Sequence, residues 1–282
     1  GLTLKWYTAD YDKYKEMIVF GVNPPGRLFS LSNGERTHYF FRTRGDKVTN
    51  EAVEIGSDKE ETKKYLRKAN VPTPEGTEFT AEDSEEDIIE YALKLGFPLV
   101  LKPTDGSLGK GVVTNIKNVE ELRKAIHYVR DELEFENLIL ERFIPGKEYR
   151  LYVVDDKVIA VYNRQPANIT GDGVHTIEEL IHMKNYERRQ NARLNSCLIE
   201  IDKEVLHFVQ QAGYTLDSIP KKGEKILLRQ KTNVSAGGDP IDVTDEFPEE
   251  VEQIAIHAVK AMPGLHHCGV DIIVDITKRP LE

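Results

Sequence analysis

An apolar segment that ends in a lysine and runs directly into a glycine-rich loop constrains the fold of this chain most. Residues 97–103 read Phe-Pro-Leu-Val-Leu-Lys-Pro, and residues 104–111 read Thr-Asp-Gly-Ser-Leu-Gly-Lys-Gly. The apolar run is short and flanked by glycine and proline, which predicts a buried strand. Burying the charge of Lys102 at the end of that strand is costly without an anionic partner.

The loop after this strand is suited to hold an anion. Glycine lets successive backbone N–H groups approach a phosphate closely, and Gly106, Gly109 and Gly111 supply three such positions. Ser107 lies between the first two. Residues 112–116 then resume an apolar strand, so the lysine and the loop lie in a hairpin, unlike a P-loop, which opens a helix. The glycine spacing alone equally fits an ordinary turn.

Composition excludes several classes of protein. The chain has 282 residues and a formal net charge of −10, so it lacks the basic character of a general nucleic-acid-binding protein. No apolar run approaches the length that spans a bilayer, and no signal peptide opens the chain. Cys197 and Cys268 have no CxxC spacing, which favours a reduced, cytoplasmic setting.

Hairpins and helices follow one another along the chain. A strand pair is expected at 28–31 and 37–41 around Asn33-Gly34, and the hydrophobic spacing and helix-capping residues predict the other elements. Helices are predicted at 58–69, 84–95, 119–133, 176–190, 202–211 and 249–262, and further strands at 138–144, 148–154, 158–162, 225–229 and 269–275. This order favours α+β lobes over an alternating βαβ array.

Three charged residues have both a functional and a structural interpretation. Glu141 lies in the apolar strand 138–144. Either it faces an adenine, for which Phe143 and Ile144 form apolar walls, or it is simply a charged residue on an edge strand. Glu148 opens the next strand and either binds ribose hydroxyls or pairs with a surface lysine. Lys59, near the start of a helix, is by position alone a solvated lysine.

Two arginines and one aspartate suggest phosphoryl chemistry. Arg164 and Arg229 lie at strand ends, and such a pair near a glycine loop can clamp a transferring phosphoryl group, although each alone is more often a surface ion pair. Asn233 opens the small-residue loop 233–238. Asp271 interrupts an apolar strand, so its carboxylate needs a partner, which is either a metal ion or a buried arginine or lysine.

Taken in order, these pieces resemble the ATP-grasp superfamily, most of all the ATP-grasp domain of cyanophycin synthetases and bifunctional glutathione synthetases. The motifs that carry the resemblance are residues 58–63, 71–76, 101–111, 141–150, 164–173, 176–181, 213–218, 228–238 and 269–271. Each motif is modest alone, but their number, order and spacing make the match specific from about residue 28 onward.

The resemblance implies an α+β, ATP-grasp fold in which two α+β lobes hold a nucleotide between them. It implies an N-terminal segment at 1–56, part of a region that precedes the ATP-grasp domain, and the domain itself at 57–282, with lobes at about 77–145 and 146–282. The implied enzyme is an ADP-forming carboxylate–amine ligase that joins an acid to an amine, such as an amino acid or peptide, through an acyl-phosphate. Nucleic acids and membranes are not expected partners, and related ligases commonly form homodimers.

The resemblance also assigns roles to residues. Lys59 and Lys102 would contact the phosphates of ATP, the loop with Gly106, Ser107, Gly109 and Gly111 would close over them, and Glu141, Arg142, Phe143 and Ile144 would hold the adenine. Glu148 would bind the ribose. Asp271 would bind Mg²⁺, with Mn²⁺ as an alternative, and Arg164, Arg229 and Asn233 would be catalytic. Phosphoryl transfer depends mainly on positioning and charge neutralisation, which these residue types supply.

One departure from the family pattern is expected to matter. Family members continue past the strand of Asp271 into a Glu-x-Asn motif that completes the metal site, and this sequence ends at Glu282 without it. We interpret the sequence as incomplete at this end, because the upstream motifs would have little reason to persist in a dead site. Two alternatives stay open: a nucleotide-binding regulatory module without ligase chemistry, and a phosphotransferase on the same fold.

Overall fold

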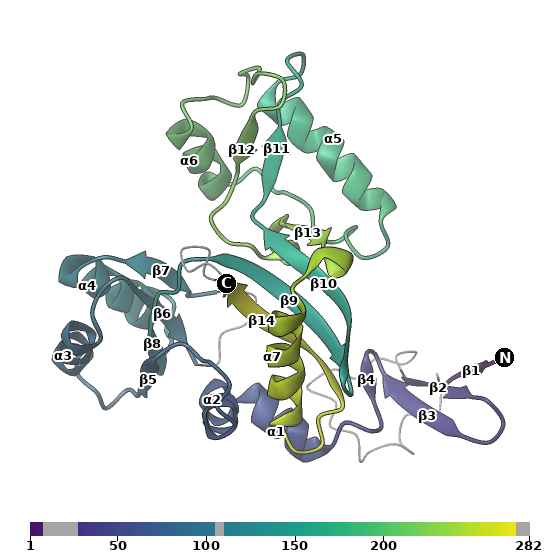
Figure 1. The fold of residues 1–282 in the computed structure, drawn as a ribbon. Helices are drawn as coiled ribbons and strands as arrows, with labels where there is room; N and C mark the ends of the chain where they lie inside the picture. The colour runs from purple at the N-terminus through teal and green to yellow at the C-terminus, as the bar shows by residue number, and fades with distance from the viewer. Residues whose placement is uncertain (8–27, 105–109, 275–282) are drawn as a thin grey trace. The chain divides into compact units, whose positions relative to one another are not determined.

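The computed structural model describes residues 1–7, 28–104 and 110–274 (Figure 1). The contacts within the chain divide it into two compact units. The first unit contains residues 1–73, 152–158 and 249–270. The second contains residues 74–151, 159–248 and the segment that begins at Asp271. None of the helices in the described part of the chain has the length and apolar content to cross a lipid bilayer.

A small antiparallel sheet begins the first unit. Its strands follow the order β1 (Thr3–Trp6), β2 (Leu28–Ser32), β3 (Thr37–Phe41) and β4 (Arg44–Gly45). The hairpin predicted around Asn33-Gly34 is confirmed: the Asn33 side chain accepts hydrogen bonds from the next backbone N–H groups at Glu35 and Arg36, at 3.0 and 2.8 Å. Gly34 takes a φ of +93°, which glycine adopts without strain.

Three helices complete the first unit: α1 (Asn50–Ser57), α2 (Lys59–Lys68) and α7 (Glu249–Lys260). Asp58 caps α2 as predicted, accepting from the N–H groups of the first turn. The sequence did not predict α1, although the Thr49 side chain caps it locally by accepting from the Ala52 N–H at 3.1 Å. The Thr49 backbone N–H donates to Gly264 O at 3.1 Å. A Cβ on Gly264 would lie 2.2 Å from the Thr49 hydroxyl, so this contact requires glycine.

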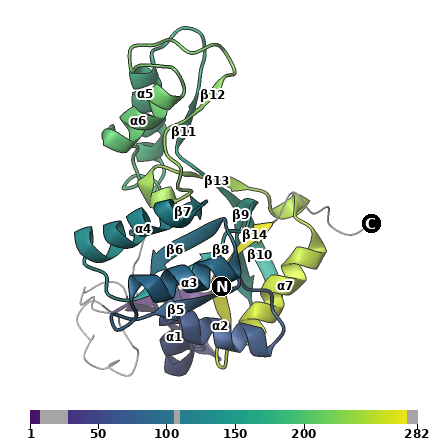
Figure 2. The same ribbon diagram turned by 90° about the vertical axis from the view of Figure 1, so that its left-hand side faces the viewer.

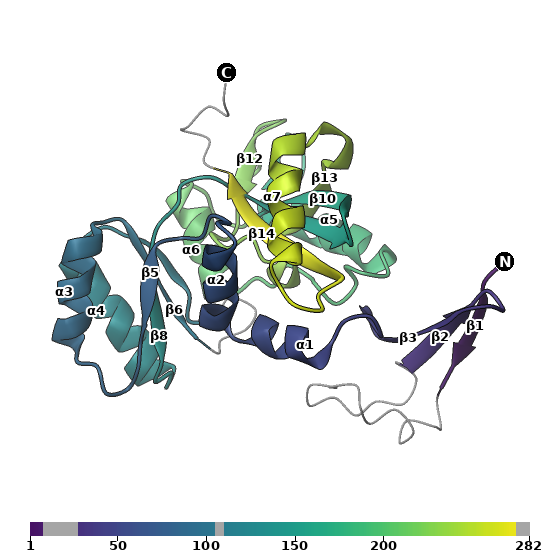
Figure 3. The same ribbon diagram turned by 60° about the horizontal axis from the view of Figure 1, so that its bottom comes forward.

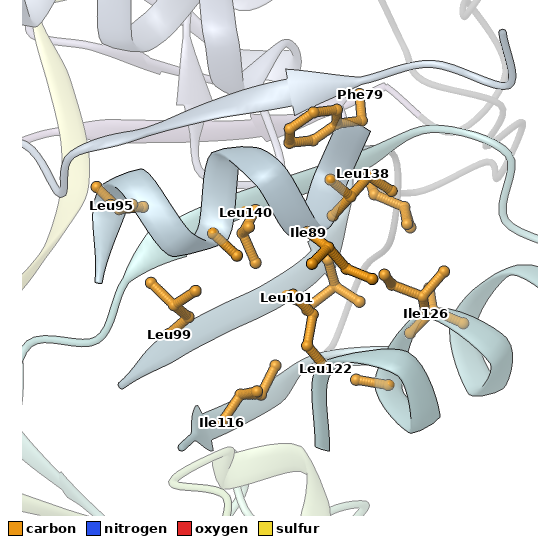
Figure 4. Packing of buried hydrophobic residues seen from close by; sticks show 14 residues of the cluster. Phe79, Ile89, Leu95, Leu99, Leu101, Ile116, Leu122, Ile126, Leu138 and Leu140 are labelled. Carbon is orange, nitrogen blue, oxygen red and sulfur yellow. The ribbon is translucent and has the colours of Figure 1, made fainter. Parts of the chain in front are cut away.

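A second antiparallel sheet forms the first part of the second unit. Its strand order is β5 (Gly76–Phe79), β8 (Leu138–Arg142), β6 (Leu99–Pro103) and β7 (Val113–Ile116). Helices α3 (Glu85–Leu95) and α4 (Val119–His127) lie on the same side of it (Figure 3). The buried core fills the space between these helices and the sheet, as Figure 4 shows for Ile89, Leu101, Leu122, Ile126 and Leu140.

Strand alternation gives this sheet two different faces. Leu99 and Leu101 of β6 and Leu140 of β8 belong to the helix-covered core. Because successive side chains of a strand point to opposite faces, Lys102 and Glu141 project from the other face. One face of the sheet is thus apolar, and the other carries this charged pair beside the buried Ile139.

Local capping explains where α3 begins, and tertiary contacts explain why α4 ends early. Ser84 and Asp87 form a reciprocal capping box at the predicted start of α3. The helix predicted over 119–133 is α-helical only to His127, and residues Tyr128–Glu132 form a π-helical turn, η2. Within that turn, Arg130 donates to the carbonyls of Thr80 and Asp83, a contact that hydrophobic periodicity does not encode.

The described residues form two further sheets. One has the order β13 (Asp239–Asp242), β10 (Lys157–Gln165), β9 (Lys147–Val154) and β14 (His267–Val274), and the other pairs β11 (Asn168–Thr170) with β12 (Lys225–Leu227). Helices α5 (Ile177–Gln190) and α6 (Lys203–Gln211) lie beside β11 and β12 (Figure 2). They share a core with these strands that includes Ile169, Ile181, Val205 and Ile226. Short 3₁₀ turns follow at Val234–Ala236 (η3) and Thr244–Glu246 (η4).

Candidate functional site

Lys102 and Glu141 form an ion pair on the charged face of the β5–β8 sheet. Lys102 Nζ lies 2.6 Å from Glu141 Oε2, and the two side chains are 23% and 5% exposed. Strands β6 and β8 align Lys102 with Ile139 and Val100 with Glu141, so the two side chains meet diagonally across the strands. Lys102 therefore has the anionic partner that its burial requires. The edge-strand interpretation of Glu141 is wrong, because β8 lies between β5 and β6.

Gly76 makes room for this ion pair. It is aligned with Glu141 in the β5–β8 ladder. A Cβ at this position would lie 2.3 Å from Leu140 O and 2.8 Å from Glu141 Cγ, closer than non-bonded atoms approach. The absence of a side chain at Gly76 is therefore what lets the Glu141 carboxylate occupy its position.

The residues after Glu141 leave the strand. Arg142 is exposed and its guanidinium lies 3.2 Å from a carboxylate oxygen of Glu75. Phe143 N–H donates to Pro98 O at 3.0 Å, and the side chains of Phe143 and Ile144 are half-buried. Their contact with adenine stays a prediction.

The glycine loop is described only at its two ends. Gly106, Ser107 and Gly109 lie outside the described residues. Gly111 has a φ of +74°, and a Cβ there would lie 3.1 Å from Pro103 Cδ. Lys110 Nζ lies 5.3 Å from the centroid of the Phe135 ring, within the range of a cation–π contact. The end of the loop therefore returns to the end of β6, where Lys102 lies.

Asp271 lies between two arginines. Arg150 donates from Nη1 to both oxygens of Asp271, at 2.9 and 3.0 Å, and Arg164 Nη2 lies 3.1 Å from Oδ1. The structural alternative for Asp271, an arginine partner, is thus present, although the carboxylate side chain is 45% exposed and not buried. Sequence reasoning missed Arg150, yet its position two residues after Glu148 places both on one face of β9.

Glu148 is held by Arg164 and Thr232. Arg164 Nη1 donates to one carboxylate oxygen, and the Thr232 hydroxyl donates to the other. Burial opposes the charge of Arg164, but the carboxylates of Asp271 and Glu148 outweigh it and raise the pKa of the guanidinium above its ordinary value. Both oxygens of Glu148 therefore already accept hydrogen bonds, and a ribose would share or replace those donors.

The binding of Mg²⁺ by Asp271 stays a prediction. Mg²⁺ is usually held by one or two carboxylates together with substrate phosphates and water. In this structure the charged groups that contact the Asp271 carboxylate are the guanidinium groups of Arg150 and Arg164. In the part of the chain that the structure describes, no group of three or more His, Cys, Asp or Glu residues could hold a metal ion.

Arg229 is buried among acidic groups. Its guanidinium lies 2.7 Å from Asp202 Oδ2 and 2.7 Å from Glu204 Oε2, and it donates to Glu200 O at 3.1 Å. Burial opposes its charge, but these two carboxylates raise the pKa of Arg229 above its ordinary value. With only 7% of its surface exposed, Arg229 is not a surface ion pair.

The two remaining predicted residues have separate surroundings. Asn233 opens the η3 turn, and its carbonyl accepts from the N–H groups of Ala236 and Gly238, each at 3.0 Å. Lys59 is the first residue of α2 and belongs to the first unit, whereas Lys102 and Asp271 belong to the second. Its contact with phosphate therefore stays a prediction.

Comparisons with known proteins identify the fold around these residues. A family model described as a RimK-like ATP-grasp domain matches residues 56–172. Cyanophycin synthetase of Trichormus variabilis is 38% identical over 257 residues, which cover 90% of this chain and 28% of that protein. The glutathione biosynthesis bifunctional protein of Pasteurella multocida is 37% identical over 232 residues, covering 80% of this chain and 30% of that protein.

A solved structure supports the same assignment. The crystal structure of a bifunctional glutathione synthetase from Pasteurella multocida matches with a TM-score of 0.64 and 31% identity, over 91% of this chain and 34% of that one. The chain thus spans about a third or less of the relatives that it matches. The resemblance and the fold class expected from the sequence are confirmed. Residues 56–172 are a RimK-like ATP-grasp domain, and the chain that contains them has the α+β ATP-grasp fold.

Proposed function

We propose that this chain is the ATP-dependent ligating part of an enzyme that joins a carboxylate to an amine through an acyl-phosphate. The observation that carries the proposal is the Lys102–Glu141 pair at the end of β6, beside the returning end of the glycine loop. In this pair the ammonium group of Lys102 is already held in position by Glu141, at the place where an ATP-grasp domain is expected to bind the nucleotide phosphates. ATP use with a divalent metal ion follows from the family, and we propose Mg²⁺ as that ion.

Different residues would contact the phosphates, the adenine and the ribose of the nucleotide. Lys102 keeps 23% of its side chain exposed, so its ammonium group can donate to a phosphate oxygen while Glu141 fixes its direction. Lys59 and the loop that ends at Gly111 would add further phosphate donors. Arg142, Phe143 and Ile144 would border the adenine, and Glu148 would accept from the ribose.

The reaction would proceed in two displacement steps. A carboxylate oxygen of the acid attacks the γ-phosphorus of ATP, the bond to the β–γ bridging oxygen breaks, and ADP leaves. The amine nitrogen then attacks the acyl carbon, the amide bond forms, and inorganic phosphate leaves with the former carboxylate oxygen while the amine releases a proton. Arg164 and Arg229 would stabilise the charge on the transferring phosphoryl group. Asn233 would orient the substrates from the start of η3.

A nucleotide assay with a matched lysine control tests this proposal. ADP release would be followed with panels of amino acids and peptides as acids and amines, and ATP affinity would be measured by calorimetry. Removing a charge-assisted contact costs roughly 1.5–3 kcal/mol, so Lys102→Gln should weaken ATP binding by about 10- to 150-fold. The control is Lys124→Gln on α4, where the lysine pairs with Glu120 in solvent. Unchanged ATP affinity and turnover in Lys102→Gln would overturn the proposed site.

The same assay separates the alternatives. ATP binding without ADP release, for every acid and amine pair, would favour a regulatory nucleotide-binding module. ADP release with a phosphorylated end product and no amide would favour a phosphotransferase. Small-molecule or peptide substrates fit the ligase relatives. The cytoplasm stays the proposed compartment, supported by the lack of a CxxC spacing between Cys197 and Cys268.

A further inference from the structure

A pocket of about 400 Å³ lies within the second unit, beside Arg229. One wall is the segment 195–202 between α5 and α6, and the other is the segment from Arg229 to η3. The polar groups in its lining are Asn195, Ser196, Glu200, Asp202, Arg229 and Ser235. Its volume falls within the range of roughly 300–1,000 Å³ that is usual for small-molecule sites.

The charges of this pocket favour a cationic ligand. Arg229 is the cation of the lining, and its guanidinium group already lies against Asp202 and Glu204. Among the described residues, no lysine, arginine or histidine pairs with the exposed carboxylate of Glu200. Glu200 is therefore the group that is available to a ligand, and hydroxyl groups of Ser196 and Ser235 lie in the same lining.

Two buried polar residues of α5 hold both walls in place. Arg188, which is 4% exposed, donates to Cys197 O in one wall at 2.7 Å and to Val234 O in the other at 3.2 Å. Asn185, 5% exposed, exchanges two hydrogen bonds of 2.8 Å with the backbone of Ile199. Because these partners are backbone groups, the walls are fixed without using the side chains that line the pocket.

We propose that this pocket binds the ammonium group of an amino-acid-sized ligand through Glu200. The inference rests on the proposed function, in which the ligand is the amine substrate. If Arg229 stabilises the transferring phosphoryl group as proposed above, the amine in this pocket would lie beside the site of acyl-phosphate formation. Arg188 and Asn185 are positioning residues for this pocket.

A binding experiment without nucleotide tests the pocket directly. The probes are the amides of alanine, leucine and lysine, each compared with its Nα-acetylated form, which removes the α-ammonium charge and changes the size little. NMR titration of the full 282-residue chain follows the backbone signals of 195–202 and 235–236. At least one amine should cause saturable shifts there, and its Nα-acetylated form should bind at least tenfold more weakly.

Matched variants identify the residue responsible. Glu200→Gln should weaken the amine by about tenfold, as expected for a lost charge-assisted hydrogen bond. Glu187→Gln, an exposed site on α5, should leave the affinity unchanged. Arg188→Lys should weaken binding by loosening both walls, with the fold checked by circular dichroism. Equal binding of acetylated probes, full affinity in Glu200→Gln, or no saturable shift with any amine would overturn the inference.

Failure of the pocket and failure of the ligase can be told apart. If ATP binding depends on Lys102 but no amine binds at Glu200, the pocket inference is wrong and the proposed ligase stands. If amines bind at Glu200 but ATP binding does not depend on Lys102, the pocket stands and the proposed ligase site is wrong.

Discussion

Replacing Lys102 by methionine should destabilise the second unit by about 2–4 kcal/mol. Glu141 is 5% exposed and its carboxylate lies 2.6 Å from the ammonium group. Removing one partner of a fully buried ion pair typically costs about 3–5 kcal/mol, because the remaining charge keeps its desolvation penalty. Since Lys102 itself retains 23% exposure, water offsets part of that loss, and the expected value falls below the upper limit.

The reverse substitution should cost less. In Glu141→Leu, the flexible stem of Lys102 can carry the ammonium group into water, so we expect a loss below about 2 kcal/mol. The double variant Lys102→Met/Glu141→Leu should recover part of the stability lost by Lys102→Met alone. The two substitutions should therefore be non-additive by about 1–2 kcal/mol, as for other residues in direct contact.

Urea unfolding measures this cycle, with hydrogen exchange at the β8 amides reporting on the second unit. The single tryptophan, Trp6, belongs to the first unit, so its fluorescence reports on that unit and the β8 amides are needed to follow the second. A matched control is Lys94→Met, which removes a 2.7 Å pair with Glu90 in which both side chains are about 70% exposed, and which should cost roughly 0–0.5 kcal/mol. Additive losses, or a wild-type stability for Lys102→Met, would refute the reasoning.

Three smaller perturbations test other parts of the second unit. Thr176→Ala removes the N-cap of α5 and should lower the unfolding free energy by about 1 kcal/mol in urea titrations; an unchanged midpoint would contradict the capping role. The hydrogen bond with Asp172 raises the pKa of His175 above 6.5. The stabilising effect of this hydrogen bond is therefore fully present below pH 6.5 and is lost as the pH rises through the raised pKa. In NMR titrations Asp172→Asn should bring the pKa of His175 back toward 6.5, and an unmoved pKa would exclude this cause. Gly237→Ala combines a φ of +92° with a Cβ only 2.6 Å from Ile199 Cγ1, so it should cost at least about 1–3 kcal/mol, and thermal unfolding at the wild-type temperature would show that the loop rearranges freely.

Local signals explain the elements that could be predicted from the sequence. Asp58, Ser84 and Thr176 each cap the helix that was expected to begin after them, because a cap acts on N–H groups only two or three residues away. Helix α1 was missed although Thr49 offers the same local signal, since its side chain accepts from the Ala52 N–H. A periodic pattern could not show that Arg130 would bind Thr80 O.

The sequence indicated which charged residues need a partner in the candidate site, but it did not identify those partners. Burial implied an anion for Lys102, yet Glu141 was identified as that anion only by the alignment of β6 with β8. The same holds for Asp271, whose alternatives included an arginine but not the particular pair Arg150 and Arg164. Charge and burial are properties of single residues, whereas partners are set by how distant strands align.

Alternate side chains of strand β8 point to opposite faces of the sheet, and this limits the insertions and deletions that the strand can accept. Inserting or deleting one residue within β8 would carry Glu141 to the side of Leu140 and bring a leucine to Lys102. One event would thereby place a carboxylate in the apolar layer and remove the counter-ion. Only changes of two residues preserve both sides, so natural or engineered variants of this strand should differ by substitution or by even-numbered insertions and deletions.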